Sequence, residues 1–541
     1  MTLPSSVSPQ TSRRDFLGAS AAGLASASLA LPGLMPAVHA AGSDNLRIGL
    51  IGCGGRGTGA ASQALRADPN VRLVAMGDMF ADRLQGSLNT LRNDEEIAKR
   101  VDVKPDNCHH GFDAYKRVID SGVDVVLLTT PPGFRPMHLK AAVEANKHIF
   151  CEKPMAVDGP GVRSVLETAR EAKKRNLALV AGFCYRYEKG KRETMKRIHE
   201  GLIGDIVTLQ CVYNTGALWH RPREQGWDDM TWQVRNWLYF TWLSGDHIVE
   251  QACHSIDKMA WAMKDVPPAK AFGTGGRQSR TGPEFGHIFD HHAVVYEWAS
   301  GVKMFHHCRQ QAGCANNVTD FVYGTLGTAE VMAHRIKGKN AWIHRKKKND
   351  RAEDMYQNEH DELFASIRNG KPINDGERMA QSTLMAIMGR MATYTGQEIT
   401  WEMALNSKEN LSPPKYDFGP LPVPRSPAPA SPSLAERVAP SRGRRHRPRD
   451  GRHGRDALAG EPRGAARTSR IAILGAGPVG LEAGLYAASL ETAFRIYGKG
   501  EVGAASPRLG ARSPVQPVRH EQHRARPRRH PRLQPAAGAA G

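Results

Sequence analysis

The stretch Arg47–Ala61, RIGLIGCGGRGTGAA, constrains the fold of this 541-residue chain more than any other part of it. A short apolar run leads directly into Gly52-x-Gly54-x-x-Gly57, and an alanine-rich segment follows. This order predicts a buried strand, a tight turn and a helix whose first N–H groups are free to bind a pyrophosphate. Glycine-rich turns are common, so the rest of the chain must decide whether this one binds a dinucleotide. The candidate cofactor residues of the turn are Gly52, Gly54, Gly55, Arg56 and Gly57.

An acidic residue follows the turn at the distance that such a site requires. The run VRLVAMGD reads as a second buried strand, and it ends in Asp78, 21 residues after Gly57. A carboxylate there accepts hydrogen bonds from an adenosine ribose and repels a 2′-phosphate. We therefore predict NAD as the cofactor. NADP stays open because Arg83 lies nearby, and Asp78 as a simple helix cap is the alternative reading.

Two later strands deliver further candidate residues to the same edge of the predicted sheet. The run VDVVLLTTPP ends in Thr130 and Pro131, and HIFC leads into Glu152-Lys153-Pro154. The carboxyl ends of parallel strands meet at one edge, where doubly wound sheets bind their ligands. Thr130, Pro131, Glu152 and Lys153 therefore complete the predicted cofactor site.

A cluster of ionisable residues lies in the second half, within SGDHIVEQACHSID. Glu250, His254 and Asp257 stand at i, i+4 and i+7, so a helix over 247–263 would place them on one face, opposite Lys153. Oxidation of a secondary alcohol needs a base for the hydroxyl proton while a hydride leaves. We assign Lys153, with a lowered pKa, to polarise or protonate the substrate oxygen, and His254 to accept or relay the proton. Asp257 is expected to act indirectly, and a satisfied helix histidine is the alternative for His254.

Together these motifs resemble the Gfo/Idh/MocA family, which includes glucose-fructose oxidoreductase and inositol dehydrogenase, over about residues 46–405. Glu152-Lys153-Pro154 is the more specific mark, and the second motif is similar to the family's D-x-G-x-H-x-x-D helix. His254 and Asp257 match it, whereas Glu250 replaces Asp and Ala252 replaces Gly. The resemblance implies an NAD(P)-dependent oxidoreductase and a C-terminal sheet that lines the substrate site and mediates homo-oligomerisation.

Aromatic and basic residues suggest where a carbohydrate could bind. Trp219, Arg235 and Trp237 lie in one segment, and Tyr185 follows the apolar run Leu177–Phe183, which reads as the next strand of the parallel sheet. Aromatic faces stack on sugar rings and polar groups bind their hydroxyls, although tryptophans equally anchor packing or subunit interfaces. We predict a small-molecule carbohydrate as the substrate and these four residues as its contacts.

The eight cysteines form no C-x-x-C pair and read as buried free thiols, with a disulfide left open if the protein is exported. A zinc site built from His247, Glu250 and His254 is poorly spaced, so we predict no metal site.

The two ends of the chain differ in character from its middle. Residues 1–40 contain Ser12-Arg13-Arg14-Asp15-Phe16-Leu17, a mildly apolar run and Val38-His39-Ala40. These features predict a cleaved twin-arginine signal, the export machinery as a partner and a periplasmic location.

Most of the formal charge of +20 lies beyond Leu421, so we predict no nucleic-acid binding by the folded part. Residues 412–541 are predicted to be disordered.

The predicted organisation is α/β throughout. Residues 46–185 form a Rossmann domain with a doubly wound parallel sheet, and residues 186–411 form an α/β domain with a mostly antiparallel sheet. The tail holds a second, truncated GxGxxG fragment at 470–503, read as a frame-shift or fusion product, with a polyanion-binding tail as the alternative. The function is predicted to be a sugar oxidoreductase. An NAD-dependent glycosidase that passes through a transient keto-sugar, or a non-catalytic sugar sensor, stays open.

Overall fold

The computed structural model describes residues 44–345, 354–426, 471–474, 494–497 and 503–504. These fall into two compact units, 1–445 and 446–541. The predicted export signal and most of the predicted disordered tail, including Gly475 and its glycine motif, lie outside the described residues. In the second unit, two short strands on either side of that motif pair in parallel, and a third joins the second of them in the antiparallel direction. They are β16 (Ile471–Leu474), β17 (Phe494–Tyr497) and β18 (Gly503–Ala504).

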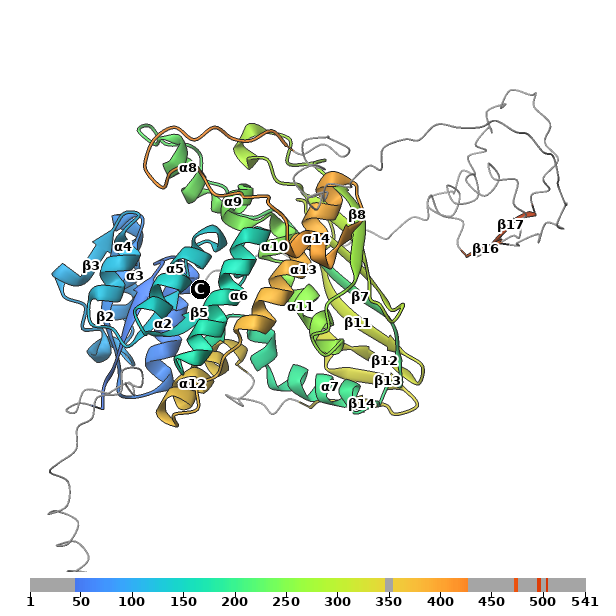
Figure 1. Cartoon of the computed structure of the whole chain (residues 1–541), viewed down its shortest axis with the longest axis horizontal. Coiled ribbons are helices and arrows are strands. Elements are labelled where there is room, and N and C mark those ends of the chain that lie inside the picture. The colour runs from blue at the N-terminus through green and yellow to red at the C-terminus, as the bar shows by residue number, and fades with distance from the viewer. Residues whose placement is uncertain (1–43, 346–353, 427–470, 475–493, 498–502, 505–541) are drawn as a thin grey trace, which may run out of the picture. The chain divides into compact units, whose positions relative to one another are not determined.

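A six-stranded parallel sheet of order β3-β2-β1-β4-β5-β6 forms the N-terminal half of the first unit (Figure 1). The order reverses between β1 and β4, which is where doubly wound sheets bind ligands. The sequence predicted every strand except the short, polar third one. The strands are β1 (Leu46–Ile51), β2 (Val71–Asp78), β3 (Cys108–His110), β4 (Val125–Leu128), β5 (His148–Cys151) and β6 (Leu179–Ala181).

Helices connect these strands as the right-handed crossovers of a Rossmann fold require. The first helix begins at Gly55, inside the glycine-rich turn, which is five residues before the alanine-rich run that starts at Ala60. The helices are α2 (Gly55–Ala67), α3 (Ala81–Arg92), α4 (Ala114–Asp120), α5 (Arg135–Glu144) and α6 (Gly159–Lys174).

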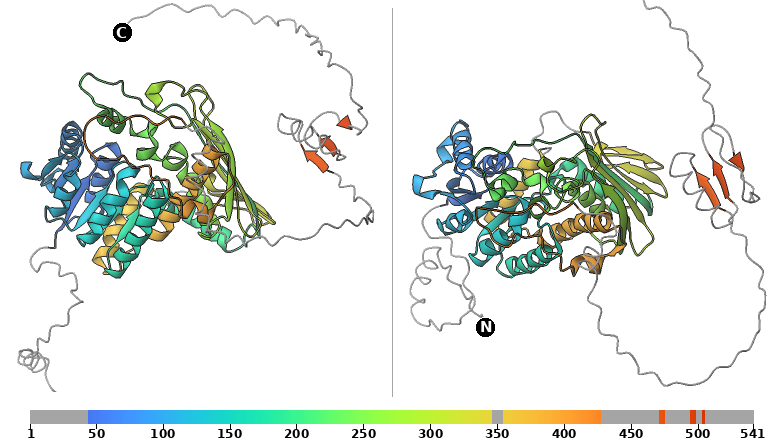
Figure 2. Two further views of the ribbon diagram at one scale, coloured as in Figure 1. Left: turned by 45° about the horizontal axis from the view of Figure 1, so that its top comes forward. Right: turned by 90° about the horizontal axis from the view of Figure 1, so that it is seen from above.

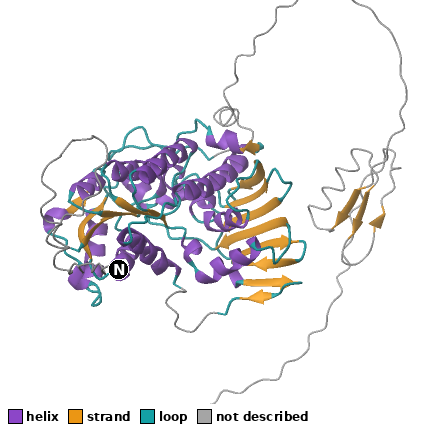
Figure 3. Ribbon diagram, turned by 60° about the horizontal axis from the view of Figure 1, so that its bottom comes forward, coloured by secondary structure: helices purple, strands orange, loops and turns teal. Residues whose placement is uncertain are grey.

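A nine-stranded, mostly antiparallel sheet forms the second half, and only β7 and β10 pair in parallel (Figure 3). The runs near 207–213, 293–298 and 302–308 predict three of its strands, β7, β9 and β10. The strands that the sequence did not reveal are short or glycine-rich, except the eight-residue β11. The strands are β7 (Ile206–Thr215), β8 (Lys270–Gly276), β9 (His291–Glu297), β10 (Lys303–Gln310), β11 (Asn317–Gly324), β12 (Gly327–Glu330), β13 (Arg335–Gly338), β14 (Trp342–Ile343) and β15 (Ile399–Thr400).

Helices α11 (Cys253–Ala262) and α13 (Gly376–Thr395) pack on one face of the large sheet, on the side of the Rossmann half, so the large sheet has one covered face and one open face (Figures 2 and 3). Phe272 and Phe305 are exposed on it, while alternate residues of β10 are buried. The helices are α7 (Lys189–His199), α8 (Asp229–Arg235), α9 (Thr241–Ser244), α10 (His247–Glu250), α11 (Cys253–Ala262), α12 (Met355–Arg368), α13 (Gly376–Thr395) and α14 (Trp401–Leu405). No described helix combines the length and apolar character needed to cross a membrane.

Three predictions about segment boundaries need correction. The single helix expected over 247–263 is divided into α10 and α11, with Gln251 and Ala252 between them. Helix α12 packs on α2 and its Leu363 and Phe364 join the Rossmann core, so 186–411 is not one continuous domain. Residues 412–426 are described and Tyr416 packs on Phe134 and Trp242, so the ordered part continues beyond 411.

Arg135, at the start of α5, holds the carboxyl edge of the parallel sheet together. Its side chain is fully buried and donates to the carbonyl oxygens of Leu128 at 2.8 Å, Thr130 at 2.8 Å and Pro154 at 2.9 Å. These carbonyls belong to the segments after β4 and β5, on which the predicted cofactor residues lie.

We expect Arg135→Met to lower the free energy of unfolding by about 3 kcal/mol or more, because the Thr130 and Pro154 carbonyls lose this charged donor and the Leu128 carbonyl keeps only the N–H of Glu152. Urea denaturation measures the change. Arg170→Met on the exposed side of α6 is the matched control and should change stability by less than about 0.5 kcal/mol. An equal loss in both variants would contradict this role for Arg135.

Candidate active site

One cleft of about 560 Å³ gathers the predicted site residues. It lies at the carboxyl edge of the parallel sheet and is closed on its other side by residues of the C-terminal half. All predicted site residues except Asp257 and Tyr185 line it. They are Gly52, Gly54, Gly55, Arg56, Gly57, Asp78, Thr130, Pro131, Glu152, Lys153, Trp219, Arg235, Trp237, Glu250 and His254.

The glycine-rich turn has the shape that a dinucleotide pyrophosphate needs. Gly52 has φ +99°, and a Cβ on Gly57 would lie 1.9 Å from the Gly52 carbonyl oxygen. A Cβ on Gly54 or Gly55 would meet no atom within 4 Å, so these positions border open space at the N-terminus of α2. The residues present therefore fit a pyrophosphate at this helix end.

Asp78 lies where a ribose would bind and is held by the backbone. Its carboxylate accepts hydrogen bonds from the N–H of Cys53 at 2.7 Å and of Phe80 at 2.9 Å. Burial raises the pKa of Asp78, and these two N–H groups act against that rise. Helix α3 begins at Ala81 without a side-chain cap, so Asp78 is not a helix cap.

Arg56 joins the glycine-rich turn to the next part of the site. Its Nε lies 2.5 Å from Glu152 Oε1, and its terminal nitrogen lies 2.7 Å from Oε1 of the fully buried Glu359 on α12. The other carboxylate oxygen of Glu152 accepts the N–H of Lys153 at 3.0 Å. Arg56 and Glu152 thus bind each other and position the turn and Lys153 as one unit.

Lys153 crosses the cleft to the C-terminal half. Its Nζ lies 2.6 Å from the carbonyl oxygen and 3.1 Å from Oε1 of Glu250, which leaves the third N–H free. Burial on its own would lower the pKa of Lys153, but the negative groups around it, of which Glu250 contributes most, together outweigh burial and raise the pKa. The lowered pKa expected from the sequence is therefore wrong for this ion pair, and Lys153 is a cation at neutral pH.

His254 is a neutral base beside that cation. Burial lowers its pKa well below the ordinary value, and the charges of Lys153 and Lys258 lower it further. Its Nδ1 is buried without a hydrogen-bond partner, and its ring contacts Tyr185 edge to face with centroids 5.2 Å apart. An uncharged imidazole next to a charged ammonium can accept a proton while the ammonium donates a hydrogen bond.

Asp257 points away from the cleft, although it follows the same motif. Its carboxylate binds Arg186 at 2.8 Å and Ser382 at 2.7 Å, and it is almost fully buried. The break between α10 and α11 precedes both His254 and Asp257, so it alters the position of Glu250 relative to them and does not by itself separate Asp257 from His254. Asp257 therefore fixes α11 against neighbouring elements and has no contact with the reacting region.

The aromatic and basic residues predicted to bind substrate lie partly at the ribose end of the cleft. Arg235 binds both carboxylate oxygens of Asp82, at 2.8 and 3.0 Å, and its guanidinium lies 4.0 Å from the ring centre of Phe80. Asp82 and Phe80 follow Asp78, so Arg235 closes this end across the two halves. Its charged group is thus paired with Asp82, and its assignment as a substrate contact stays a prediction.

Tyr185 borders a second cavity of about 630 Å³ beside the first. Its ring lies against His254 and 4.1 Å from Nζ of Lys258, so it separates His254 from that cavity without lining the main cleft. Trp219 and Trp237 line the main cleft, as predicted.

Several lining residues escaped the sequence analysis. Phe80, Arg221 and Tyr356 border the main cleft. Arg83 also borders it, and burial is the main reason why the pKa of Arg83 is lowered. The charge of Arg221 lowers this pKa further, and the charge of Asp78 acts in the opposite direction. Phe80 had a usable signal, because it directly follows the strand that ends in Asp78. Tyr356 had none, since α12 returns to the Rossmann half only after the whole second sheet.

Comparison with known proteins agrees with this geometry. Residues 46–180 match the model of the oxidoreductase family GFO_IDH_MocA, described as an NAD-binding Rossmann fold, and residues 192–330 match the GFO/IDH/MocA C-terminal domain. An inositol 2-dehydrogenase of Salmonella typhimurium is 30% identical over 292 residues, 53% of this chain and 74% of that protein. Inositol 2-dehydrogenase 3 of Saccharopolyspora erythraea is 27% identical over 260 residues, 48% of this chain and 65% of that protein.

Solved structures share the two-domain fold. The scyllo-inositol dehydrogenase of Lactobacillus casei with bound NAD(H) and scyllo-inositol superposes with a TM-score of 0.50 at 18% identity, over 66% of this chain and 99% of that chain. The aldose-aldose oxidoreductase of Caulobacter crescentus gives 0.51 at 17% identity, with the same coverage. The predicted Rossmann domain, its NAD-binding character and the mostly antiparallel second sheet are therefore confirmed.

We expect Gly57→Ala to abolish NAD binding, because its Cβ would overlap the Gly52 carbonyl and force the turn open. Isothermal titration with NAD measures the loss. Gly59→Ala, two residues on in α2, is the control: its Cβ meets only Arg56 at 3.5 Å, so affinity should change by less than about threefold. Unchanged NAD affinity in Gly57→Ala would contradict the assignment of this turn.

Proposed function

Because the chain belongs to the Gfo/Idh/MocA oxidoreductase family, we propose that it oxidises a secondary alcohol of a sugar or cyclic polyol with NAD as hydride acceptor. The observation that carries this proposal is the pairing of a charged Lys153 with a neutral His254 in the cleft that the glycine-rich turn borders. When bound, NAD supplies the acceptor for the hydride that leaves the substrate carbon.

Lys153 has the role of binding the reacting oxygen. Two of its three N–H groups are held by Glu250, and the third is available to a substrate hydroxyl. As a fixed cation it stabilises the negative charge that develops on that oxygen as the proton leaves. Glu250 holds the ammonium in position and in its charged form.

His254 has the role of the base. Its ring is neutral, and its buried Nδ1 has no partner within the described residues. The Glu250 carboxylate serves as the ion-pair partner of Lys153 through Oε1, while its Oε2 is buried without a hydrogen-bond partner among the described residues. The proton of the substrate hydroxyl therefore passes to His254 in the proposed reaction.

NAD rather than NADP is the proposed form of the cofactor. Asp78 is fixed by two N–H groups with its carboxylate at the ribose end, where it would repel a 2′-phosphate. Arg83 and Arg221 bring positive charge to the same end of the cleft, where it would attract a 2′-phosphate. The preference for NAD over NADP therefore depends on whether the repulsion by Asp78 exceeds the attraction by these two arginines. Parallel titrations with NAD and NADP measure this balance directly.

The substrate class rests on the relatives. Several are named inositol 2-dehydrogenases, and this chain spans 65% of the length of the Saccharopolyspora protein. A polyhydroxylated ring is the proposed substrate, with Trp219 and Trp237 offering apolar faces in the cleft. Incubation with inositols, aldoses and glycosides, followed by cofactor absorbance and product analysis, identifies it.

A cofactor-recycling glycosidase is the second candidate, and the Arg235–Asp82 pair favours it. This two-point contact joins both halves across the ribose end and would slow cofactor release. A retained cofactor suits a reaction that returns the hydride to the substrate within each turnover. Release of an aglycone without net NADH would select this function, whereas NADH accumulation would select the dehydrogenase.

Export and assembly remain proposals as well. The twin-arginine sequence at Arg13 and Arg14 supports transport of a folded, cofactor-loaded protein to the periplasm. The open face of the large sheet, with Phe272 and Phe305 exposed, supports association of copies through that face. Cell fractionation and the mass of the purified protein in solution test the two proposals.

We expect Lys153→Met to lower kcat by at least about 100-fold, because the developing oxyanion loses its fixed cation. The matched control, Lys140→Met on the exposed side of α5, should leave kcat unchanged. Melting temperature and NAD affinity are measured in both variants to separate lost chemistry from unfolding. Full activity in folded Lys153→Met would remove the assignment.

We also predict the shape of the pH profile. A histidine base with an ordinary pKa loses activity as pH falls through about 6.5. Because the pKa of His254 is lowered well below that value, the base stays available, and kcat/KM should not decline there. Because the pKa of Lys153 is raised, its cation is retained as pH rises, and no loss should appear at the ordinary lysine value. An acidic limb centred near 6.5 that disappears in His254→Asn would contradict this.

A further inference from the structure

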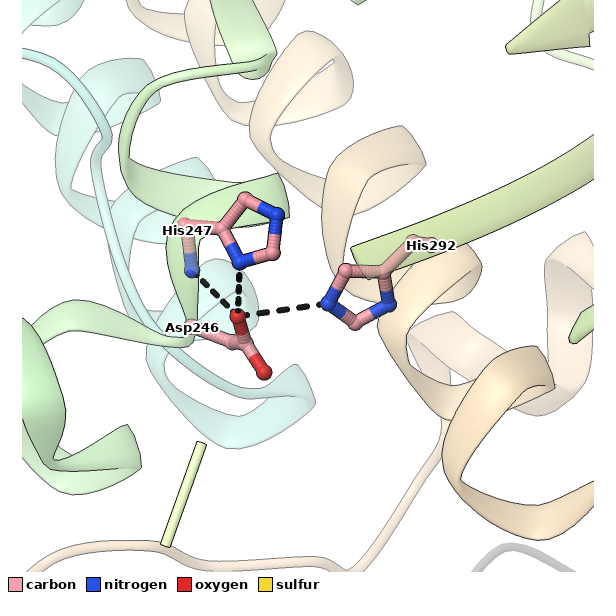
Figure 4. A group of neighbouring side chains, drawn as sticks. All are labelled: Asp246, His247 and His292. Atoms are coloured by element: carbon pink, nitrogen blue, oxygen red, sulfur yellow. Dashed lines mark hydrogen bonds and ion pairs between the residues drawn. The ribbon is translucent and has the colours of Figure 1, made fainter. Parts of the chain in front are cut away.

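A second cluster of ionisable side chains lies outside the cleft, at the start of α10. Asp246, His247 and His292 are each at most 3% exposed, and none of them borders the cleft. His247 Nδ1 lies 2.8 Å and His292 Nε2 lies 3.2 Å from the same oxygen, Asp246 Oδ1. Figure 4 shows both rings directed at this oxygen, one from α10 and the other from β9.

The protonation of His292 can be read from its other ring nitrogen. His292 Nδ1 lies 2.9 Å from the Thr393 hydroxyl, and that hydroxyl donates its only hydrogen to the Arg390 carbonyl at 3.0 Å. The hydroxyl therefore accepts from His292, which must carry its hydrogen on Nδ1. In a neutral His292 the lone pair of Nε2 then faces a carboxylate oxygen. Two acceptors at 3.2 Å require a cation between them, either a proton or a metal ion.

The rest of the cluster is arranged as a ligand set. Asp246 Oδ2 accepts from the Tyr394 hydroxyl at 2.5 Å and the Phe289 N–H at 2.9 Å, which aims Oδ1 at the histidines. Asp246 also adopts φ +82°, a conformation that a side-chain-bearing residue rarely takes. His247 Nε2 and His292 Nε2 are buried and make no hydrogen bond among the described residues. Metal-binding histidines commonly donate their second ring N–H to a polar partner, as His292 does to Thr393.

We propose that Asp246, His247 and His292 bind one divalent transition-metal ion of the zinc type. Their ligand atoms lie within 4.8 Å of one another, and two imidazoles with one carboxylate are a donor set that such ions prefer. Around a tetrahedral ion with bonds of about 2.0–2.2 Å, the ligand atoms are about 3.3–3.6 Å from one another. The 3.2 Å between His292 Nε2 and Asp246 Oδ1 nearly meets this spacing, whereas the 2.8 Å between His247 Nδ1 and Asp246 Oδ1 must lengthen when the ion binds. The Nδ1 hydrogen of His247 leaves as a proton when the ion binds.

The position of this site gives the ion a structural role. The backbone carbonyl of Asp246 accepts the N–H of Val249 at 3.0 Å and of Glu250 at 2.9 Å, which forms the first turn of α10. Glu250 in turn holds Lys153 in the cleft. A metal ion on Asp246 and His292 would therefore tie α10 to β9 and fix the carboxylate that positions Lys153.

The test uses untagged, full-length protein produced in minimal medium supplemented with Co²⁺ or Zn²⁺. We expect about one tightly held ion per chain by mass spectrometry, and a cobalt spectrum of nitrogen and oxygen ligation without thiolate charge transfer. The zinc-loaded protein should melt at a higher temperature than protein grown without added metal. Absence of bound ion, or a thiolate spectrum from one of the eight cysteines, would overturn the proposal and leave a buried imidazolium–carboxylate pair.

Variants locate the ion. His292→Gln and Asp246→Asn should each lower the bound metal at least about tenfold. His307→Gln is the matched control, because His307 is an exposed histidine on the neighbouring strand β10 and should keep the metal. Equal metal content in His292→Gln and His307→Gln overturns the proposal. The wild-type cobalt spectrum decides the matter if either ligand variant does not fold.

Discussion

The contact between Lys153 and Glu250 is the interaction on which the candidate active site depends. It joins the segment after the fifth parallel strand to α10 of the second half, and both groups are largely shielded from water. Burial lowers the pKa of Lys153, and the negative groups around it, Glu250 foremost, more than offset that effect. Burial is also the main reason for the lowered pKa of His254, and the charge of Lys153 lowers it further. The ion pair thus contributes to the protonation of both groups in the proposed reaction.

The Rossmann half was largely predictable because its signals are local. The turn from Gly52 to Gly57 and the acid at the end of the next strand have fixed spacings that reflect backbone geometry. Buried parallel strands such as VVLL and HIFC read as continuous apolar runs. The third strand was missed because three polar residues carry no such pattern. The site residues on these loops followed from the topology, since all parallel strands end at one edge.

The second half was less predictable because its decisive contacts are distant in the sequence. Helical spacing placed Asp257 with Glu250 and His254, but its carboxylate is bound by Arg186, 71 positions earlier in the chain. Arg235 was predicted to contact the substrate, and its ion-pair partner Asp82, 153 positions earlier, could not be foreseen from the sequence. The predicted zinc alternative grouped His247 with its neighbours along the chain, whereas its spatial partner is His292 on another strand. Spacing along one element cannot reveal such partners.

Helix α12 has a consequence for how the two halves can move. The chain leaves the Rossmann half after β6, builds most of the large sheet, and comes back to cover α2 with Leu363 and Phe364 before α13 leads away again. Over residues 44–426, apart from the undescribed 346–353, the chain therefore passes between the halves at least three times instead of once. A simple hinge would have to bend all three at once. Entry to and exit from the cleft are thus expected to depend on small local displacements, such as opening of the Arg235 contact, while the sheets keep their relative orientation.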